Sequence, residues 1–393
     1  MKKIIFILCF PLICFGQINL TDFGAKGDGV TDDTKAFQSA INKAIEVKGK
    51  LIIPPPSNFY KITNTILVVP SKGNQVFLDI DAWGWGNGTN AIRYMGASNK
   101  PVFKIVGLKQ AVWTGLKIGI NEGLTGVQIF DIDTTPAAES TSFVTFKNFY
   151  LNLGNKPNNE GFRLGHLSGG SADISNYQWE NCVVFGNRLP GQIAYHVEGN
   201  NTLSNTWMGG FVAYCDRIFS NVSGAGAKAE RGNGSVYFYG LGASQNNTDF
   251  EFAFEQTYII SGGRFEAGGR FLEVVDHNFH ASITVIGCQI NDYEPADGVL
   301  MYMGTAGSLV VDNCNMNRKG GDFSNMILLG GTGNKGTLMV RGGAASSAKP
   351  FYKKTGKDTQ WKVYIQGVGK FKSPNGVFTS DMFDDEHPFS KTN

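Results

Sequence analysis

Two acidic residues that lie two positions apart, Asp131 and Asp133, are the first candidates for chemistry in this sequence. On a β-strand, residues two apart share a face and stand about 6.6–6.8 Å apart at Cα. This spacing is compatible with the roughly 6.5–9.5 Å between the carboxylates of an inverting glycoside hydrolase. We therefore predict a catalytic pair here. The alternative is a solvated strand end before the polar segment 134–136.

A second candidate group combines a histidine with carboxylates. His196 and Glu198 are again two positions apart, and Asp216 follows one sequence repeat later. Histidine titrates near neutral pH and can act as a general base. The sequence thus offers His196, Glu198 and Asp216 as further catalytic candidates, and the alternative is an exposed polar edge.

Charged residues at strand spacing could also bind substrate. Arg264 and Glu266 lie two apart, and an arginine in this setting could bind an acidic sugar. Other charged residues occupy the same outward position in successive repeats, where salt bridges are the expected outcome. These predicted salt bridges join Lys147 to Glu180 and Asp312 to Arg341.

Aromatic side chains could stack on sugar rings, and Tyr150 and Tyr195 are the candidates for substrate binding. Trp179 and Trp207 belong to the same stretch of sequence. They occupy the apolar position of a repeat that should point inward, so core packing is the predicted role for these two.

The elements that must position these residues form a repeat, in which an apolar residue and any residue precede Gly or Asn. The Gly or Asn positions are 22 to 33 residues apart. Each repeat alternates with period two, not with the helical period of 3.6. The Gly or Asn residues of this repeat are Gly115, Asn148, Asn181, Gly209, Gly240, Gly262, Gly287, Asn313 and Gly342.

A second ladder advances together with the first. A turn residue followed by alternating apolar residues begins at positions 126, 161, 192, 217, 249, 270 and 298. Two ladders with unequal steps indicate coils of variable loop length on constant strands. This is typical of a parallel β-solenoid, in which each coil stacks on the last.

The cysteines fit the interior of such a solenoid. Cys182, Cys288 and Cys314 directly follow the Gly or Asn of their repeats, where other repeats carry Leu or Phe. We predict buried thiols that pack as small hydrophobes. A Cys288–Cys314 disulfide is the alternative. The cysteines after the export signal show no CxxC spacing of the kind that indicates a zinc site, and no other metal site is recognised in the sequence.

The sequence of segment 22–37 predicts a cap over the N-terminal end of the solenoid. Its glycines allow a tight loop, Thr31 is the expected N-cap, and Asp32 and Asp33 suit the first turn of a helix. An apolar stripe at helical period follows, so we expect a capping helix over about 32–47.

The chain begins with the pattern of a cleavable export signal, residues 1–16, in which an apolar stretch too short to span a bilayer follows two lysines. Without Lys2 and Lys3 the 35 basic residues become 33, equal to the 33 acidic residues. This balance does not favour nucleic-acid binding. We expect a secreted or periplasmic protein that does not bind a membrane after cleavage.

The segment from Asp22 to Gly29, with Thr31 to Thr34 and then Ala36-Phe37, resembles the opening motif of pectate-lyase-like right-handed β-helix proteins of the rhamnogalacturonase/epimerase type. The resemblance implies an all-β, right-handed parallel β-helix (solenoid) with an N-terminal capping helix. We expect one β-helix domain over 17–343 and a C-terminal capping segment over 344–393.

The resemblance also implies a function connected with carbohydrate. The family includes hydrolases, lyases, epimerases and non-catalytic spikes. Its hydrolase motifs have no counterpart here, since Gly165-His166 lacks a following Gly and Asp32-Asp33 falls in the capping helix. We expect a protein that cleaves an extracellular polysaccharide or oligosaccharide as hydrolase or lyase, with calcium as the cofactor of a lyase. A non-catalytic carbohydrate-binding or surface protein and a phage tailspike are the alternatives.

Overall fold

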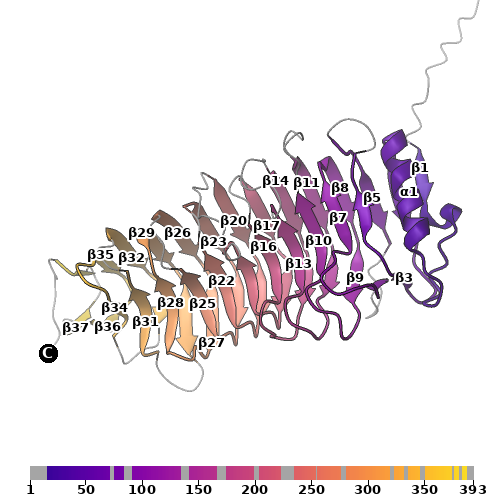
Figure 1. Ribbon diagram of the computed structural model, residues 1–393. Coiled ribbons are helices and arrows are strands. Elements are labelled where there is room, and N and C mark those ends of the chain that lie inside the picture. The colour runs from indigo at the N-terminus through magenta and orange to yellow at the C-terminus, as the bar shows by residue number, and fades with distance from the viewer. Residues whose placement is uncertain are drawn as a thin grey trace, which may run out of the picture.

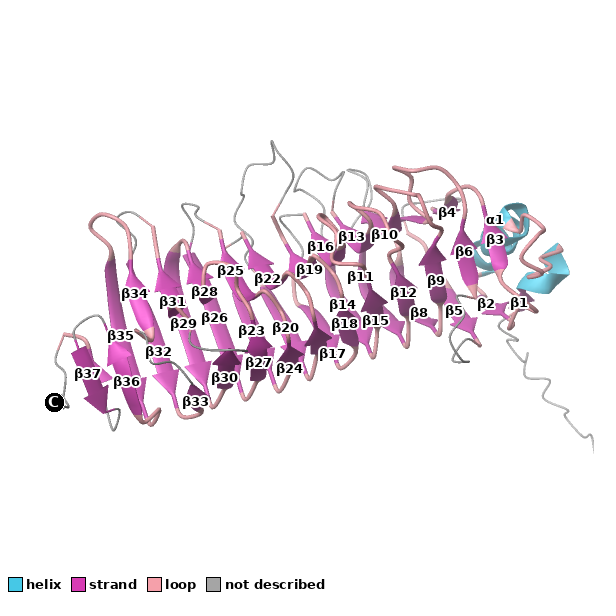
Figure 2. Ribbon diagram, turned by 90° about the horizontal axis from the view of Figure 1, so that it is seen from below, coloured by secondary structure: helices cyan, strands magenta, loops and turns pink. Residues whose placement is uncertain are grey.

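The chain winds into an elongated stack of coils with one α-helix at its N-terminal end (Figure 1). Three sheets of mainly parallel strands, named A, B and C below, run along the stack (Figure 2). The predicted all-β parallel β-helix with a capping helix is confirmed. This computed structural model describes residues 16–70, 75–83, 91–133, 141–165, 174–198, 203–222, 234–253, 255–275, 280–318, 323–331, 335–345, 350–373, 376–379 and 383–386. Residues 1–15 of the predicted export signal lie outside these ranges.

From β2 to β34, each coil contributes one strand to each sheet. Sheet A has 14 strands, namely β1 (Gln17–Asn19), β2 (Lys50–Ile53), β5 (Asp79–Ala82), β8 (Lys109–Thr114), β11 (Thr141–Lys147), β14 (Ile174–Glu180), β17 (Asn205–Met208), β20 (Ser235–Tyr239), β23 (Thr257–Ser261), β26 (His280–Ile286), β29 (Ala306–Asp312), β32 (Lys335–Arg341), β35 (Gln360–Gln366) and β38 (Phe383–Asp384). Sheet B has 11 strands, namely β3 (Tyr60–Ile62), β6 (Ile92–Tyr94), β9 (Lys117–Ile120), β12 (Tyr150–Asn152), β15 (Val183–Phe185), β18 (Phe211–Ala213), β21 (Gly242–Ser244), β24 (Arg264–Glu266), β27 (Gln289–Tyr293), β30 (Asn315–Arg318) and β33 (Ala344–Ala345).

Sheet C carries the site described below. Its 11 strands are β4 (Ile66–Val68), β7 (Phe103–Val106), β10 (Gln128–Asp133), β13 (Glu160–Leu164), β16 (Ile193–Val197), β19 (Arg217–Ser220), β22 (Thr248–Phe252), β25 (Arg270–Val274), β28 (Val299–Met303), β31 (Asn325–Leu329) and β34 (Tyr352–Lys354).

The Gly and Asn residues of the first sequence ladder form the corner between sheets A and B. All nine have positive φ, from 51° at Asn181 and Asn313 to 76° at Gly115. Glycine adopts this left-handed conformation without strain, and asparagine tolerates it better than most residues. The corner requires a residue that tolerates positive φ. This requirement explains why Gly or Asn recurs in each repeat while the loops vary in length.

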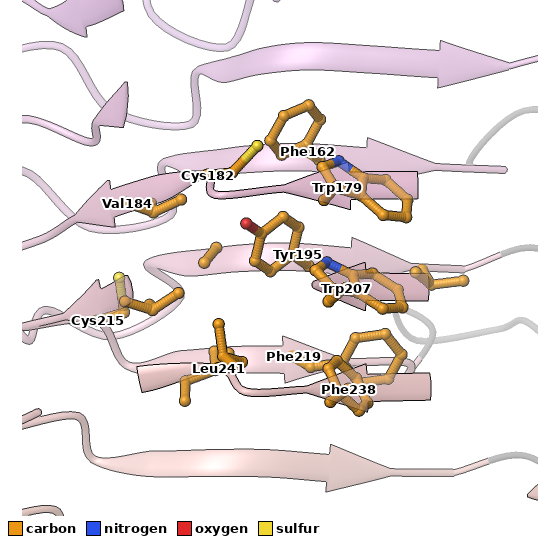
Figure 3. Close-up of a cluster of buried hydrophobic side chains, with 14 of the residues drawn as sticks. Phe162, Trp179, Cys182, Val184, Tyr195, Trp207, Cys215, Phe219, Phe238 and Leu241 are labelled. Carbon is orange, nitrogen blue, oxygen red and sulfur yellow. The ribbon is translucent and has the colours of Figure 1, made fainter. Parts of the chain in front are cut away.

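The interior is filled by apolar side chains stacked coil on coil. The side chains that follow six of the corners are at most 2% exposed, namely Leu116, Phe149, Cys182, Leu241, Cys288 and Cys314. All three cysteines are free thiols, so the prediction of buried thiols is confirmed. Trp179 and Trp207 also point inward as predicted, with ring centroids 4.4 Å apart and an interplanar angle of 6° (Figure 3).

The outward face of sheet A carries the predicted salt bridges. Lys147 Nζ lies 2.8 Å from Glu180 Oε2, and Arg341 Nη2 lies 2.6 Å from Asp312 Oδ2. Each pair joins neighbouring strands in register. Since these side chains are partly exposed, each pair contributes about 0–1 kcal/mol.

The N-terminal end is closed by the short 3₁₀ helix η1 (Leu20–Phe23) and the helix α1 (Thr34–Val47), which lies beside β1 (Figure 1). The cap position is Asp33, so the prediction of Thr31 as N-cap is wrong. Asp28 holds Thr31 in the loop instead, accepting its backbone N–H at 2.7 Å. Asp33 accepts the N–H groups of Lys26 and Gly27 at 2.7 and 3.2 Å, so these acids shape the loop before the helix.

Parallel stacking continues beyond the expected end of the repeat at residue 343. Strands β34 and β35 add to sheets C and A, and β35 runs in parallel with β32 up to Gln366. The antiparallel strand β38 then covers β35, and the hairpin of β36 (Lys370–Ser373) and β37 (Gly376–Thr379) lies at the C-terminal end (Figure 2). These strands cap the last coil, which would otherwise expose unpaired backbone.

Among the described residues, no helix has both the length and the apolar character needed to cross a membrane.

One carboxyl group lies inside this core. Asp249, on β22, is 1% exposed and accepts hydrogen bonds from the Tyr293 hydroxyl and from Asn246 Nδ2. Burial raises its pKa from 3.8 to about 7, although both hydrogen bonds oppose this shift. Between these two values the unfolded chain ionises while the folded chain keeps its proton, so stability falls as pH rises towards 7.

We expect Asp249→Asn to remove this loss of stability. The free energy of unfolding of the variant, compared with that of the unmodified protein, should be similar at pH 4 and higher by roughly 2–4 kcal/mol at pH 8. Urea unfolding at the two pH values measures the difference, and Asp22→Asn, at an exposed carboxyl, serves as control. An equal effect of Asp249→Asn at both pH values would contradict the pKa assignment.

Candidate functional site

A cleft of about 660 Å³ lies on the outer face of sheet C, over its first four strands β4, β7, β10 and β13. Lys104, Asp131, Glu160 and Arg163 line it together with Lys100 and several uncharged residues. Parallel strands in register place Lys104, Asp131 and Arg163 side by side on successive coils. The cleft thus brings together charged groups that are 27 to 32 residues apart in sequence.

The predicted pair Asp131 and Asp133 shares a single cation. Lys104 Nζ lies 2.7 Å from Asp131 Oδ2 and 3.9 Å from Asp133 Oδ2. An ammonium group therefore lies between the two carboxylates, where an inverting pair would hold the scissile bond and a water molecule. Asp131 lines the cleft, and its second oxygen, Oδ1, is buried without a hydrogen-bond partner among the described residues.

A second carboxylate of the cleft, Glu160, contacts the predicted histidine. Glu160 Oε1 lies 2.7 Å from His196 Nδ1, one coil away on β16. Glu160 Oε2 is buried without a hydrogen bond and lies 3.8 Å from Arg163 Nε. Asp131 and Glu160 therefore share a feature: each has one oxygen bound by a cationic group and one oxygen that no described residue engages by a hydrogen bond.

His196 lies behind the cleft, and both of its ring nitrogens face oxygen atoms that can accept hydrogen bonds. Its Nε2 lies 3.1 Å from the carbonyl oxygen of Val222 and 3.4 Å from Glu198 Oε1. Burial alone would lower its pKa, but the hydrogen bond that His196 donates to Glu160 and the charges of Glu160 and Glu198 raise the pKa above 6.5. The structure thus favours an imidazolium that holds Glu160 in place, whereas the sequence favoured a general base.

The carboxylate of Glu198 is held by an arginine of the neighbouring coil. Arg163 donates from Nε and Nη2 to Glu198 Oε1 at 2.9 and 2.6 Å. Both side chains are mostly buried, with 20% and 9% of their surface exposed. Charged hydrogen bonds of this kind fix geometry as well as adding stability.

Asp216 does not join His196 and Glu198, which corrects the grouping predicted from sequence. It precedes β19, whereas Glu198 follows β16, so the two lie at opposite ends of neighbouring strands. Its oxygens accept from Gly191 N at 2.8 Å and from Asn247 Nδ2 at 2.9 Å, and it also pairs with Arg217. These contacts give Asp216 a structural role in joining three coils.

The predicted substrate-binding residues lie away from the cleft. Tyr195 is a core residue, 1% exposed and stacked on Phe162 at 5.5 Å, so the prediction that it contacts substrate is wrong (Figure 3). Tyr150 and the pair Arg264 and Glu266 lie on sheet B instead. Arg264 and Glu266 form an exposed ion pair with each other at 2.5 Å.

Lys104, Glu160 and Arg163 were not predicted from the sequence. The signal that could have found two of them is the repeat itself. Lys104, Asp131, Arg163 and His196 hold the same outward position on four successive coils. Glu160 directly precedes Gly161, a member of the second ladder.

No group of three or more His, Cys, Asp or Glu side chains within the described ranges could hold a metal ion. The calcium expected for a lyase stays a prediction from the sequence resemblance.

The sequence matches a family model described as rhamnogalacturonase A/epimerase, pectate lyase-like, over residues 17–78. Alginate lyase 7 of Azotobacter vinelandii is 35% identical over an 81-residue alignment that covers 17% of this chain and 9% of the relative. The preneck appendage protein of Bacillus phage PZA is 30% identical over 111 residues, covering 28% of this chain and 12% of the relative. The chain thus matches about a tenth of the length of these curated relatives.

Solved structures share the fold along nearly the whole chain. PfbA, a surface adhesin of Streptococcus pneumoniae, matches with a TM-score of 0.53 and 12% identity, covering 96% of this chain and 95% of that one. The Agl-KA catalytic domain matches with a TM-score of 0.51 and 14% identity, covering 88% of this chain and 68% of that one. At such identities the likeness shows the fold alone. Together with the match of residues 17–78 to the family model, the coils described above make the chain similar in fold to pectate-lyase-like parallel β-helix proteins.

Proposed function

We propose that this protein is an exported enzyme that cleaves an extracellular polysaccharide in the cleft on sheet C. The observation that carries the proposal is the pair Asp131 and Glu160, two carboxylates of one cleft that each keep an oxygen without a hydrogen-bond partner among the described residues. Buried oxygens of this kind are rare in folded proteins, and they are suited to contact a ligand or to move a proton.

The surroundings support proton transfer by these two groups. Lys104 and His196 each bind one oxygen of their carboxylate, which fixes its orientation. Arg163 lies beside Asp131 in the strand register, and its Nε is 3.8 Å from Glu160 Oε2, so a positively charged residue neighbours both acids. An enzyme that cleaves glycosidic bonds needs two such groups, one on each side of the bond.

Two reactions fit a pair of this kind. In hydrolysis, one carboxyl protonates the leaving oxygen while the other carboxylate activates water or attacks the sugar carbon. In elimination from a uronate, a carboxylate takes the C5 proton, the electron pair forms the C4–C5 double bond, and the C4–oxygen bond breaks as the leaving oxygen gains a proton. The relative named alginate lyase 7 supports the second reaction, although it matches only a short stretch.

Incubation of the purified protein with neutral and uronate polysaccharides tests the proposal. Hydrolysis should release reducing ends alone, and elimination should also release unsaturated ends that absorb in the ultraviolet. Parallel reactions with calcium and with a chelator test the calcium requirement that the sequence resemblance implies for a lyase. Tight binding to a polysaccharide without either product would reject the enzyme and favour the second candidate.

That second candidate is a non-catalytic carbohydrate-binding protein of the cell surface. The observation in its favour is the pairing of charges in the cleft, where Lys104 and Arg163 both form ion pairs with protein carboxylates. The shared fold with the adhesin PfbA is compatible with it. Product analysis separates the two candidates because binding alone releases no new chain ends.

A further inference from the structure

Sheet B carries a second surface with the properties of a sugar-binding site. On its outer face, three half-buried aromatic rings lie on three successive coils: Tyr150 on β12, Phe185 on β15 and Phe211 on β18. The ring centroids of Tyr150 and Phe185 are 5.5 Å apart, and those of Phe185 and Phe211 are 6.1 Å apart. We call these three residues the aromatic strip.

The spacing of the strip follows from the fold. Neighbouring strands are about 4.8 Å apart, so each coil advances the strip by close to the length of one pyranose in an extended chain. The strip breaks the usual pattern of the sheet, since half-buried rings take the place of polar residues at outward positions. A contiguous apolar surface that keeps part of its area exposed is typical of a binding site.

A polar cleft of about 600 Å³ borders the strip. Asn152, which is in register with Phe185, lines it, together with Arg93, Glu122, Asn155 and Asn187. This cleft is separate from the one on sheet C, and it shares no lining residue with it.

The backbone fixes three of the four asparagine amides that line the cleft and leaves half of each of these amides available. Asn152 Oδ1 accepts from Gly154 N at 2.8 Å, Asn155 Oδ1 accepts from Gly123 N at 3.1 Å, and Asn187 Nδ2 donates to Gly154 O at 2.6 Å. Asn152 Nδ2, Asn155 Nδ2 and Asn187 Oδ1 have no hydrogen-bond partner within the described part of the chain. They thus present two donors and one acceptor that are already oriented, which reduces the entropy cost of binding.

The charge of the surface indicates which sugars it takes. Within the cleft Arg93 and Glu122 balance one another, and the exposed pair Arg264–Glu266 further along sheet B is neutralised internally. Lys117, whose Nζ lies 5.6 Å from the Tyr150 ring centroid, is a further cation beside the strip, but it is only 7% exposed. The exposed charges named here therefore balance and offer no strong attraction to a polyanion. Hydroxyl groups, which both donate and accept, suit the amides, and the C–H faces of pyranose rings suit the strip.

We infer that the aromatic strip and the bordering cleft on sheet B form a binding site for a neutral, extended polysaccharide. The site lies on a different sheet from the candidate catalytic cleft. It would hold a polymer against the outside of the solenoid, and the inference does not depend on the reaction proposed for sheet C.

Isothermal titration calorimetry with cello-oligosaccharides as the neutral probe tests this inference. Phe185→Ala removes the central ring, and we expect it to weaken binding at least tenfold. Asn155→Ala removes an exposed amide and should weaken binding several-fold without affecting folding. Tyr239→Ala is the matched control, because Tyr239 is a 42% exposed ring that stacks on Tyr237 on sheet A. It should leave the affinity unchanged.

The outcomes separate this site from the one on sheet C. Binding that survives in Glu160→Gln but is lost in Phe185→Ala supports the site on sheet B, whatever the enzymatic assay shows. Absence of binding to the neutral probe would overturn the inference. Equal or tighter binding of oligouronates would overturn the assignment to neutral sugars, and unchanged affinity in both Phe185→Ala and Asn155→Ala would overturn the location.

Discussion

Glu160→Gln is expected to lower the rate of polysaccharide cleavage by roughly 10²–10⁴-fold, which is the range for loss of a general acid or base. The amide keeps the shape of the side chain but cannot carry the proton that the carboxylate would take or give. Glu160 has one oxygen on His196 at 2.7 Å and the other without a hydrogen bond, so the variant removes the group that the cleft leaves available. Initial rates at saturating substrate, with reducing ends as the readout, measure the effect.

Two further variants make this result interpretable. Asp131→Asn should produce a loss of similar size, since Asp131 is the second carboxylate of the cleft with a free oxygen. Glu266→Gln changes a carboxylate that is also ion-paired but lies on sheet B, and it should retain full activity. Because Glu160→Gln also weakens a buried ion pair, its melting temperature must be measured. Full turnover by a folded Glu160→Gln protein would reject the role proposed for this residue.

Trp207→Ala is expected to destabilise the fold by about 3–5 kcal/mol, the usual cost of removing a buried Trp side chain. Trp207 is 1% exposed and lies between the rings of Trp179 and Phe238, with centroid distances of 4.4 and 4.7 Å (Figure 3). Its removal leaves a cavity that two neighbouring coils share, and neither coil can close it alone. The midpoint and slope of urea unfolding give the change in free energy.

Two controls separate packing from a general sensitivity to substitution. Trp207→Phe should cost clearly less, because Phe238 already occupies the equivalent position on the next coil. Trp83→Ala removes a tryptophan that is 67% exposed, and it should change stability by no more than about 0.5 kcal/mol. If Trp207→Ala cost no more than Trp83→Ala, the stacked rings would not be a main source of stability.

The coils could be predicted from sequence because the corner between sheets A and B imposes the same backbone conformation each time. That requirement restricts the residue at the corner to Gly or Asn, and the restriction is visible without a structure. The inward side chains after each corner, such as Cys182, were predictable for the same reason. The start of α1 could not be predicted in the same way, because the side chains of Asp28 and Asp33 accept hydrogen bonds from the loop backbone and do not cap the helix.

The candidate site was only partly predictable. Asp131 and His196 could be predicted because each has another candidate residue two positions away, and a pair of that spacing on one strand is visible in the local sequence. Their partners Lys104, Glu160 and Arg163 come from neighbouring coils, about thirty residues away, and the variable loops hide this relation. Tyr195 was misassigned because all five residues of β16 are buried, so exposure does not alternate along this strand.

The left-handed corners have a consequence for how such a protein can change over time. Since each corner resets the register of the chain, an insertion between two corners lengthens one loop and leaves the neighbouring coils in place. Gain or loss of a whole coil is then a single event that preserves the stack on either side. A lineage of these proteins can therefore adjust the reach of its binding surfaces in steps of one strand spacing, about 4.8 Å, without redesigning its core.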